Sequence, residues 1–163
     1  MSHATLTDEQ AAFLAGGVSL IIASRDMRRV PSLVRALGCR VDADRRTLTM
    51  WLEASASRQV LRDIEATGQV AAVFSQPSTH HTLQVKGNDA RVVASVAGDA
   101  ELIEQHRQAF AADLVRSGYP REFALAIHAT APGDEIAAVT FSVDAIFEQT
   151  PGPGAGQRIG GAA

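Results

Sequence analysis

The segment 82–87 (TLQVKG) alternates polar and apolar residues, and this alternation restricts the structures it can adopt. Successive side chains of a β-strand point to opposite faces of a sheet. Thr82, Gln84 and Lys86 would therefore share one face, while the two apolar residues between them would face a core. Gly87 allows a β-bulge or the close approach of another backbone. Any half-exposed antiparallel strand shows the same alternation, so the pattern alone leaves open whether the polar face binds a ligand.

The composition predicts one globular domain that is large enough to bury a core. The chain has 163 residues, of which 46% are hydrophobic and 20% charged. We assign residues 1–148 to the domain and residues 149–163 to a tail rich in Pro and Gly. A net charge of −3 argues against a surface for polyanions, so we expect no nucleic-acid partner.

Targeting and redox signals favour a cytoplasmic protein. Cys39 is the only cysteine, which excludes an intramolecular disulfide and a multi-cysteine metal site, and we expect it to be a small buried side chain in a strand. The apolar run 11–23 is preceded by Asp8 and Glu9, where a signal peptide would be basic. The run is also too short to cross a bilayer, so we expect no membrane partner.

Hydrophobic periodicity and turn residues predict the order of elements. Thr7 and Gln10 form a capping-box pattern at the start of a short helix that Gly16-Gly17 ends. Further helices are expected at 55–66, 99–117 and 121–128, and strands at 18–24, 32–41, 47–52, 70–75, 80–96 (one long strand or two) and 136–143, continuing to 147.

This order predicts a mainly β protein, a β-barrel of about six antiparallel strands with flanking helices. A barrel of this size cannot enclose a large ligand. We therefore expect the active site on its outside or between subunits, in a homodimer.

The strongest candidate for an anion site is the run 55–58 (SASR) at the start of a helix. Free backbone N–H groups, hydroxyls and a guanidinium would meet there, and the helix dipole favours an anion such as phosphate. A serine N-cap followed by a surface arginine is the alternative interpretation. Arg35 and Arg40 lie five residues apart on one predicted strand, so they share a face only if a bulge forms near Gly38.

Other catalytic signatures are weak. His80 and His81 would point to opposite faces of a strand, and no set of Cys, His and carboxylate residues with metal-ligand spacing accompanies them. The remaining histidines have no nucleophile motif nearby, and the sequence has no glycine-rich dinucleotide loop and no P-loop.

Taken together, Pro31-Ser32 followed by Arg35, Ser57-Arg58 before a helix, and the strand 82–87 resemble the pyridoxamine 5′-phosphate oxidase-like flavin-binding split-barrel family. The tail around 149–156 (QTPGPGAG) is similar to that of an uncharacterised bacterial branch of this family. The tail itself could be flexible, or it could dock on its own or a partner subunit.

The resemblance implies a homodimer that binds flavin mononucleotide (FMN) at its interface and transfers hydride or electrons to a small-molecule substrate. By position, it implies phosphate contacts from Arg35, Arg40, Ser57 and Arg58, with Gln59 in place of a second cation. It places Thr82 near the flavin and makes Gln84 and Lys86 candidates for charge stabilisation near the ring. No protein residue needs to act as a catalytic acid or base.

The sequence differs from the family's pattern in two places, and these differences restrict the activity and the flavin affinity that we expect. The tail lacks the Trp and Arg that line the substrate site of the vitamin B6 oxidases, so we do not expect that activity. Glu53 and Gln59 stand where the family has other residues, which predicts modest flavin affinity. The alternative function is a module without catalysis, or one that binds haem or another cofactor, with His80, His81 or His128 as iron ligands.

Overall fold

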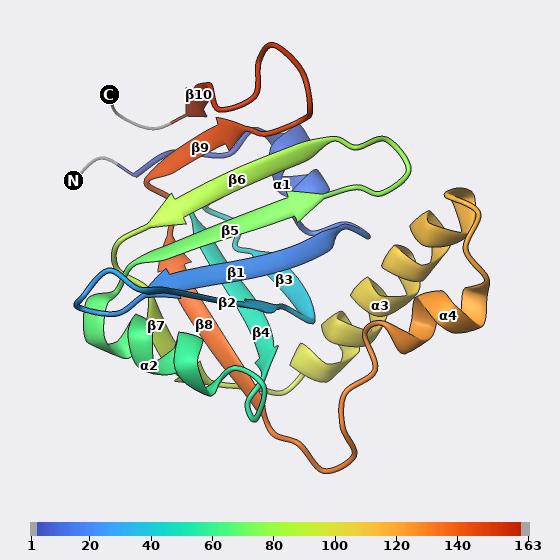
Figure 1. The fold of residues 1–163 in the computed structure, drawn as a ribbon, viewed down its shortest axis with the longest axis horizontal. Helices are drawn as coiled ribbons and strands as arrows, with labels where there is room; N and C mark the ends of the chain where they lie inside the picture. The colour runs from blue at the N-terminus through green and yellow to red at the C-terminus, as the bar shows by residue number, and fades with distance from the viewer. Residues whose placement is uncertain (1–2, 161–163) are drawn as a thin grey trace.

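The structure of the protein is a computed structural model that describes residues 3–160, and it is built from two antiparallel sheets (Figure 1). The larger sheet has six strands in the order β10-β9-β6-β5-β1-β2, and the smaller has the order β3-β4-β8-β7. The strands are β1 (Ser19–Arg25), β2 (Pro31–Arg35), β3 (Gly38–Val41), β4 (Thr47–Glu53), β5 (Val70–Ser75), β6 (Thr82–Gly87), β7 (Arg91–Ala94), β8 (Ile136–Ser142), β9 (Ala145–Glu148) and β10 (Arg158–Gly160).

The mainly β prediction is confirmed, but the expected number of strands was wrong, because the described residues form ten strands instead of about six. The predicted strand 32–41 divides into β2 and β3, which belong to different sheets. Ala36 and Leu37 are both buried, and the N–H of Ala36 bonds to Leu20 in the larger sheet while that of Leu37 bonds to Trp51 in the smaller. The chain therefore crosses between the sheets at this pair. The segment 80–96 likewise forms two strands, β6 and β7.

The two sheets share one hydrophobic core. Alternate residues of β1 and β5, such as Ile22 and Phe74, pack in the same cluster as Met50 of β4 and Phe141 of β8. The alternation predicted for β6 is confirmed, because the side chains of Leu83 and Val85 are buried and the residues between them are more exposed. Gly87 is packed against β8, where an added Cβ would lie 2.6 Å from the carbonyl oxygen of Ser142.

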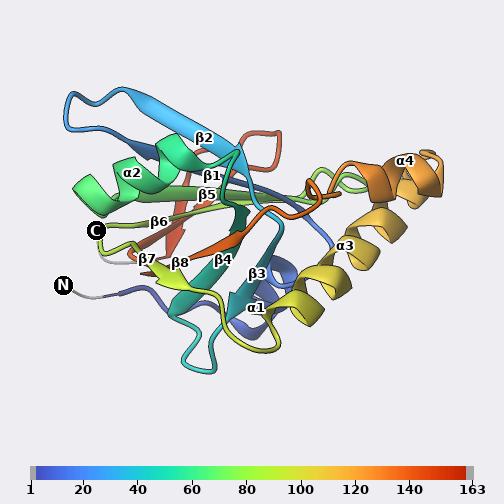
Figure 2. The ribbon, with the colours of Figure 1, turned by 90° about the horizontal axis from the view of Figure 1, so that it is seen from below.

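Four helices surround the sheets: α1 (Asp8–Leu14), α2 (Arg58–Thr67), α3 (Asp99–Arg116) and α4 (Arg121–Ala126). The capping box of Thr7 and Gln10 is confirmed at α1. Helix α2 ends at Gly68, which adopts the left-handed conformation typical of a C-terminal cap. Helix α3 packs on α4 in a hairpin at one side of the molecule (Figure 2). None of the helices within residues 3–160 has the length and apolar character needed to cross a membrane.

The described part of the tail is docked on the larger sheet. Strand β10 pairs with β9, and the N–H of Gly156 donates to the carbonyl of Glu148. The Thr150 hydroxyl accepts a hydrogen bond from the N–H of Thr82 at 3.0 Å. The end of the predicted tail, residues 161–163, lies outside the described residues, as do residues 1–2 of the predicted domain.

Candidate functional site

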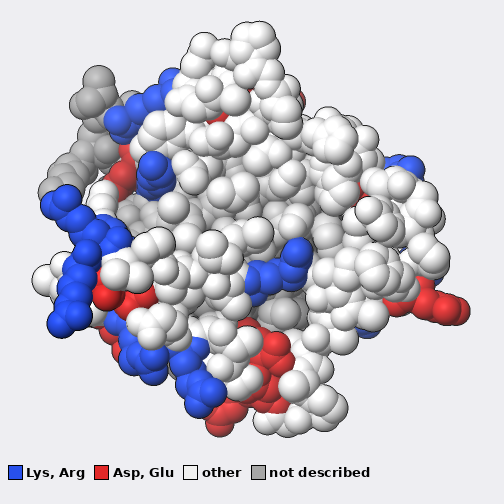
Figure 3. Space-filling view, in the orientation of Figure 1, with Lys and Arg blue, Asp and Glu red and all other residues white. Residues whose placement is uncertain are grey.

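The outer face of the larger sheet carries both polar and apolar side chains, and no described helix covers it (Figures 1 and 2). We call it the open face. Strand register divides it into three rows. The first row is Ser19, Ser75 and Thr82; the second is Arg35, Ile21, Val73, Gln84 and Phe147; the third is Leu33, Ala23, Ala71, Lys86 and Ala145. Figure 3 shows that the middle of this face is mostly free of charged side chains, which gather at its margins.

The first row forms the polar end of the open face. The hydroxyls of Ser75 and Thr82 are 2.8 Å apart, and the Arg35 guanidinium donates to the Ser19 hydroxyl at 3.0 Å. Arg35 makes no ion pair within the described residues. An exposed cation next to a row of hydroxyls can bind an anionic or strongly polar group.

The start of α2 carries unpaired hydrogen-bonding groups. Ser57 is fully buried, and its hydroxyl has no hydrogen-bond partner in the described part of the chain and does not cap the helix. The backbone N–H groups of Arg58, Gln59 and Val60 form no hydrogen bond within residues 3–160, and the exposed Arg58 side chain forms none either. A buried polar group without a partner is costly, and free N–H groups at a helix N-terminus favour an anion.

Carboxylates also lie close to this helix start. The Ser55 hydroxyl donates to Asp134 at 2.6 Å, and this bond is the main reason that the pKa of Asp134 is lowered from its usual value. Glu53 accepts a hydrogen bond from the N–H of Ala131. The charge on these carboxylates opposes the binding of a second anion nearby, although solvent screens it at this exposed position.

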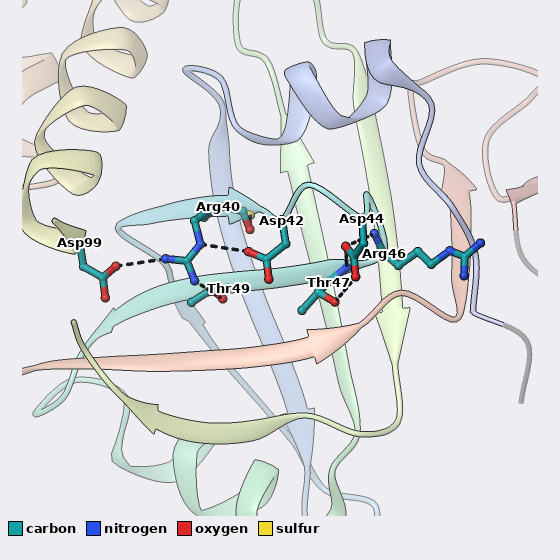
Figure 4. Close-up of polar contacts among 8 residues, drawn as sticks. Arg40, Asp42, Asp44, Arg46, Thr47, Thr49 and Asp99 are labelled. Atoms are coloured by element: carbon teal, nitrogen blue, oxygen red, sulfur yellow. Dashed lines mark hydrogen bonds and ion pairs between the residues drawn. The ribbon is translucent and has the colours of Figure 1, made fainter. Parts of the chain in front are cut away.

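Arg40 is placed differently from Arg35, since it lies on β3 in the smaller sheet. Its guanidinium contacts Asp42 at 3.1 Å, Asp99 at 3.3 Å and the Thr49 hydroxyl at 3.3 Å (Figure 4). Asp99 is buried at the start of α3, and hydrogen bonds from Ser95 and the N–H of Val96 oppose the effect of burial, so its pKa is lowered. Arg40 thus ties α3 to β3.

The remaining predicted residues are separated along the fold. Gln59 donates to Asp63 at 2.8 Å and accepts from Arg62, so its side chain is occupied within α2. Thr82 and Lys86 share a face, as predicted, but lie at opposite ends of β6. Lys86 lies over the ring of Phe147, with its amine 4.8 Å from the ring centre. Gln84 is between them, in the second row.

The three histidines proposed as iron ligands do not form one group. His80 is exposed in the turn before β6. The ring of His81 packs at a tilt against the ring of Phe13 in α1, with the ring centres 4.4 Å apart, and contacts the Thr150 hydroxyl. His128 follows α4, where it is buried against Phe110 and His106. No cluster of three or more His, Cys, Asp or Glu residues suited to a metal ion occurs in the described part of the chain.

Comparison with solved structures identifies the architecture. The chain superimposes on an F420 reductase with a TM-score of 0.57 and 14% sequence identity, covering 86% of this chain and 98% of that one. A putative pyridoxamine 5′-phosphate oxidase from Lactobacillus delbrueckii gives a TM-score of 0.52 and 12% identity, over 90% of this chain and 99% of that one. The chain has the pyridoxamine 5′-phosphate oxidase-like split-barrel fold.

The other comparisons also show low sequence identity or no match. HupZ of group A Streptococcus shares the split-barrel fold with a TM-score of 0.55 and 16% identity, over 93% of this chain and all of that one. No protein-family model matches the chain, and no curated protein sequence matches it. Identity this low shows the fold alone.

Three groups on the split barrel were missed from the sequence. Ser19 joins the polar end of the open face only through its register with Ser75. Asp134 reaches Ser55 from a loop 79 residues away. The side chain of His106 is buried in the α3–α4 hairpin. Polarity at an expected strand position could have suggested Ser19, but long-range contacts such as that of Asp134 leave no local signal.

Proposed function

We propose that the protein is a homodimeric flavoprotein that binds FMN and uses it for redox chemistry on a small molecule. The observation that carries this proposal is the start of α2, where the buried Ser57 hydroxyl, three backbone N–H groups and the Arg58 guanidinium have no hydrogen-bond partner among residues 3–160. A phosphate accepts several hydrogen bonds and carries negative charge, so it complements these donors.

The donor set fits the phosphate of FMN. Ser57 and Arg58 would bind it, and Arg35 would add positive charge from β2. Helix α2 is held against β2 by the hydrogen bond from Ser32 to Asp63 at 2.5 Å, on the face of β2 opposite to the one that carries Arg35. Thr82 and Gln84 on the open face would contact the polar edge of the ring system. When bound, the flavin supplies the capacity to take up and release a hydride or electrons.

Replacing Arg58 with Glu is expected to weaken FMN binding about tenfold or more, because a charge-assisted hydrogen bond is lost and a repulsive charge is added. The measurement is a titration of FMN fluorescence and of the melting temperature. Arg62→Glu makes the same charge change one turn further along α2 and is expected to alter the affinity much less. Asp134→Asn, which removes the opposing carboxylate, is expected to tighten binding.

Two results would contradict the proposal. One is the absence of any FMN-dependent quenching or melting shift in the wild-type protein. The other is a Soret band after incubation with haem that disappears in His128→Ala, since this would favour the haem-binding alternative. If FMN binds but Arg58→Glu retains full affinity, Ser57 and Arg58 do not form the phosphate site.

The second row of the open face supports the homodimer. Ile21 and Val73 are half-buried apolar residues at the centre of a face that no described helix covers, and Leu33 beside them is 68% exposed. Contiguous exposed apolar surface of this kind marks an interaction site in soluble proteins. A second copy of the chain is the partner that the proposal assigns to it.

Val73→Glu is expected to convert the dimer to a monomer, because it places a charge in the middle of an apolar interface. The oligomeric state is measured by light scattering after gel filtration. Val115→Glu on α3 is the control, since Val115 is 44% exposed and lies away from the open face. A wild-type protein that is monomeric at micromolar concentration would argue against the dimer.

A further inference from the structure

A cavity of about 490 Å³ lies between α1 and the strands β6, β9 and β10. Figure 1 shows α1 behind the part of the larger sheet to which these strands belong. In the pairing of β6 with β9, Glu148 lies opposite Leu83, whereas Phe147 lies opposite Gln84 on the open face. Neighbouring side chains of a strand point to opposite faces, so Glu148 points away from the open face, into the cavity.

Glu148 is at the end of a row that is otherwise part of the core. Strand register places it beside Leu83, which is followed by Phe74 and Leu20 on the next two strands. Those three side chains are at most 2% exposed. Glu148 is partly buried and forms no ion pair within residues 3–160. A carboxylate withdrawn from water without a counter-charge is costly, so this position favours a bound cation.

Glu148 keeps its negative charge in the folded protein. Hydrogen bonds from the hydroxyl and the N–H of Thr150, the latter at 2.8 Å, hold the pKa of Glu148 below its usual value. Hydrogen bonds to the ionised form of a carboxyl group favour that form. The cavity therefore contains a fixed negative charge at neutral pH.

The rest of the cavity wall supplies little positive charge. No Lys or Arg is among the described residues that line it, and Glu9 of α1 adds a second carboxylate at its exposed rim. Arg158 is next to the lining residue Ile159, but it lies opposite Phe147 and so belongs to the other face of the sheet. His81 also lines the cavity, where its Nδ1 is 3.1 Å from the Thr150 hydroxyl.

Apolar side chains form the remaining surface beside Glu148. The Phe13 ring of α1 lies next to that of His81, with the ring centres 4.4 Å apart, and Ile159 of β10 is 46% exposed. Aromatic rings attract ammonium groups and also pack against apolar groups. A mostly apolar wall with a few polar groups is typical of small-molecule sites, whose volumes are roughly 300–1,000 Å³.

We propose that this cavity binds a small organic cation, a primary amine attached to an apolar body. The ammonium group would form a charge-assisted hydrogen bond with Glu148, and the body would pack on Phe13 and Ile159. Glu9 would add a weaker attraction, because solvent screens its charge at the rim. Helix α2 contacts β1 and β2, at the other edge of the sheet from β9 and β10, so this site does not depend on FMN.

The test titrates the full-length protein with 2-phenylethylamine and follows the backbone amide shifts by NMR, with 2-phenylethanol as the uncharged probe of the same shape. We expect the amine to bind with a Kd of about 1 mM or below, and the alcohol at least about tenfold more weakly. Glu148→Gln keeps an oxygen for the N–H of Thr150 and should weaken amine binding about tenfold. Glu122→Gln makes the same charge change on the exposed surface of α4 and should leave the affinity unchanged.

Four results would overturn the proposal. They are equal affinity for the amine and the alcohol, no binding at about 10 mM amine, unchanged affinity in Glu148→Gln, and shift changes confined to the open face. The amide spectrum shows whether Glu148→Gln remains folded, and the comparison of the two probes in the wild-type protein does not require this variant. The titrations contain no FMN, so the flavin proposal can fail without affecting this one.

Discussion

Lowering the pH from 7 to 4 is expected to destabilise the protein strongly, through His106 and His128. Both side chains are buried, being 4% and 3% exposed, and none of their ring nitrogens has a hydrogen-bond partner among the residues that the structure describes. Burial lowers the pKa of each to about 4, and for His106 it outweighs the opposing effect of the nearby backbone of Val18 and Gly16. For His128, the charges of His106, Arg35 and Arg107 lower the pKa further.

The direction of the effect follows from proton binding. An unfolded histidine titrates near pH 6.5, so below that pH the unfolded chain binds protons that the folded protein excludes. The stabilising contribution is complete above about pH 6.5 and is lost as the pH falls to about 4. A shift of this size corresponds to on the order of 3 kcal/mol for each histidine.

Denaturant unfolding at several pH values measures this loss. In a His106→Leu/His128→Phe double variant, the free energy of unfolding should vary much less between pH 6.5 and 4, and Phe at 128 keeps the stacking on Phe110. The exposed His80→Ala variant is the control and should keep the wild-type profile. A double variant with the wild-type pH dependence would show that other groups, such as the buried Asp113, cause the effect.

Replacing Gly87 with Ala is expected to cost about 3 kcal/mol of stability, because the site has no room for a methyl group. The new Cβ would lie 2.6 Å from the carbonyl oxygen of Ser142 and 2.8 Å from the Phe141 ring. Both belong to β8 in the other sheet, so relief would require the two sheets to move apart at this point.

The measurement is the shift in the urea midpoint at constant m-value. Gly154→Ala is the matched control, since the nearest atom to its added Cβ is 3.8 Å away and a change within about 0.5 kcal/mol is expected. Similar midpoints for the two variants would show that the close approach of β8 at Gly87 is relieved without cost.

Helices and strands were predicted well where a single local sequence pattern determines the structure. The Thr7 and Gln10 capping box and the two faces of β6 are each determined by neighbours within a few residues, and each was confirmed. Cys39 was predicted to be buried, and burial raises the pKa of its thiol. These features depend on propensity and periodicity alone.

Features that depend on tertiary contacts were not predicted. The division of the strand 32–41 needs Ala36 and Leu37 to bond to two different sheets, and the residues at this crossing have no turn signature that would reveal it. Gly17 was interpreted only as a helix stop, yet its added Cβ would lie 2.4 Å from the backbone of Ala109 in α3, so close helix packing also requires a glycine. The placement of Arg40 in a network with Asp42 and Asp99 similarly depends on α3.

The strand register that arranges the open face in rows has a consequence for how such a protein can change by insertion and deletion. A single inserted residue inside β6 would exchange its two faces, placing Lys86 in the core and Val85 outside, so folding and ligand contacts would fail together. An insertion of the same length in the turn at 76–81 leaves the pairing of β5 with β6 intact. Length variation among functional descendants of this chain should therefore be concentrated in that turn, while β6 keeps a constant length.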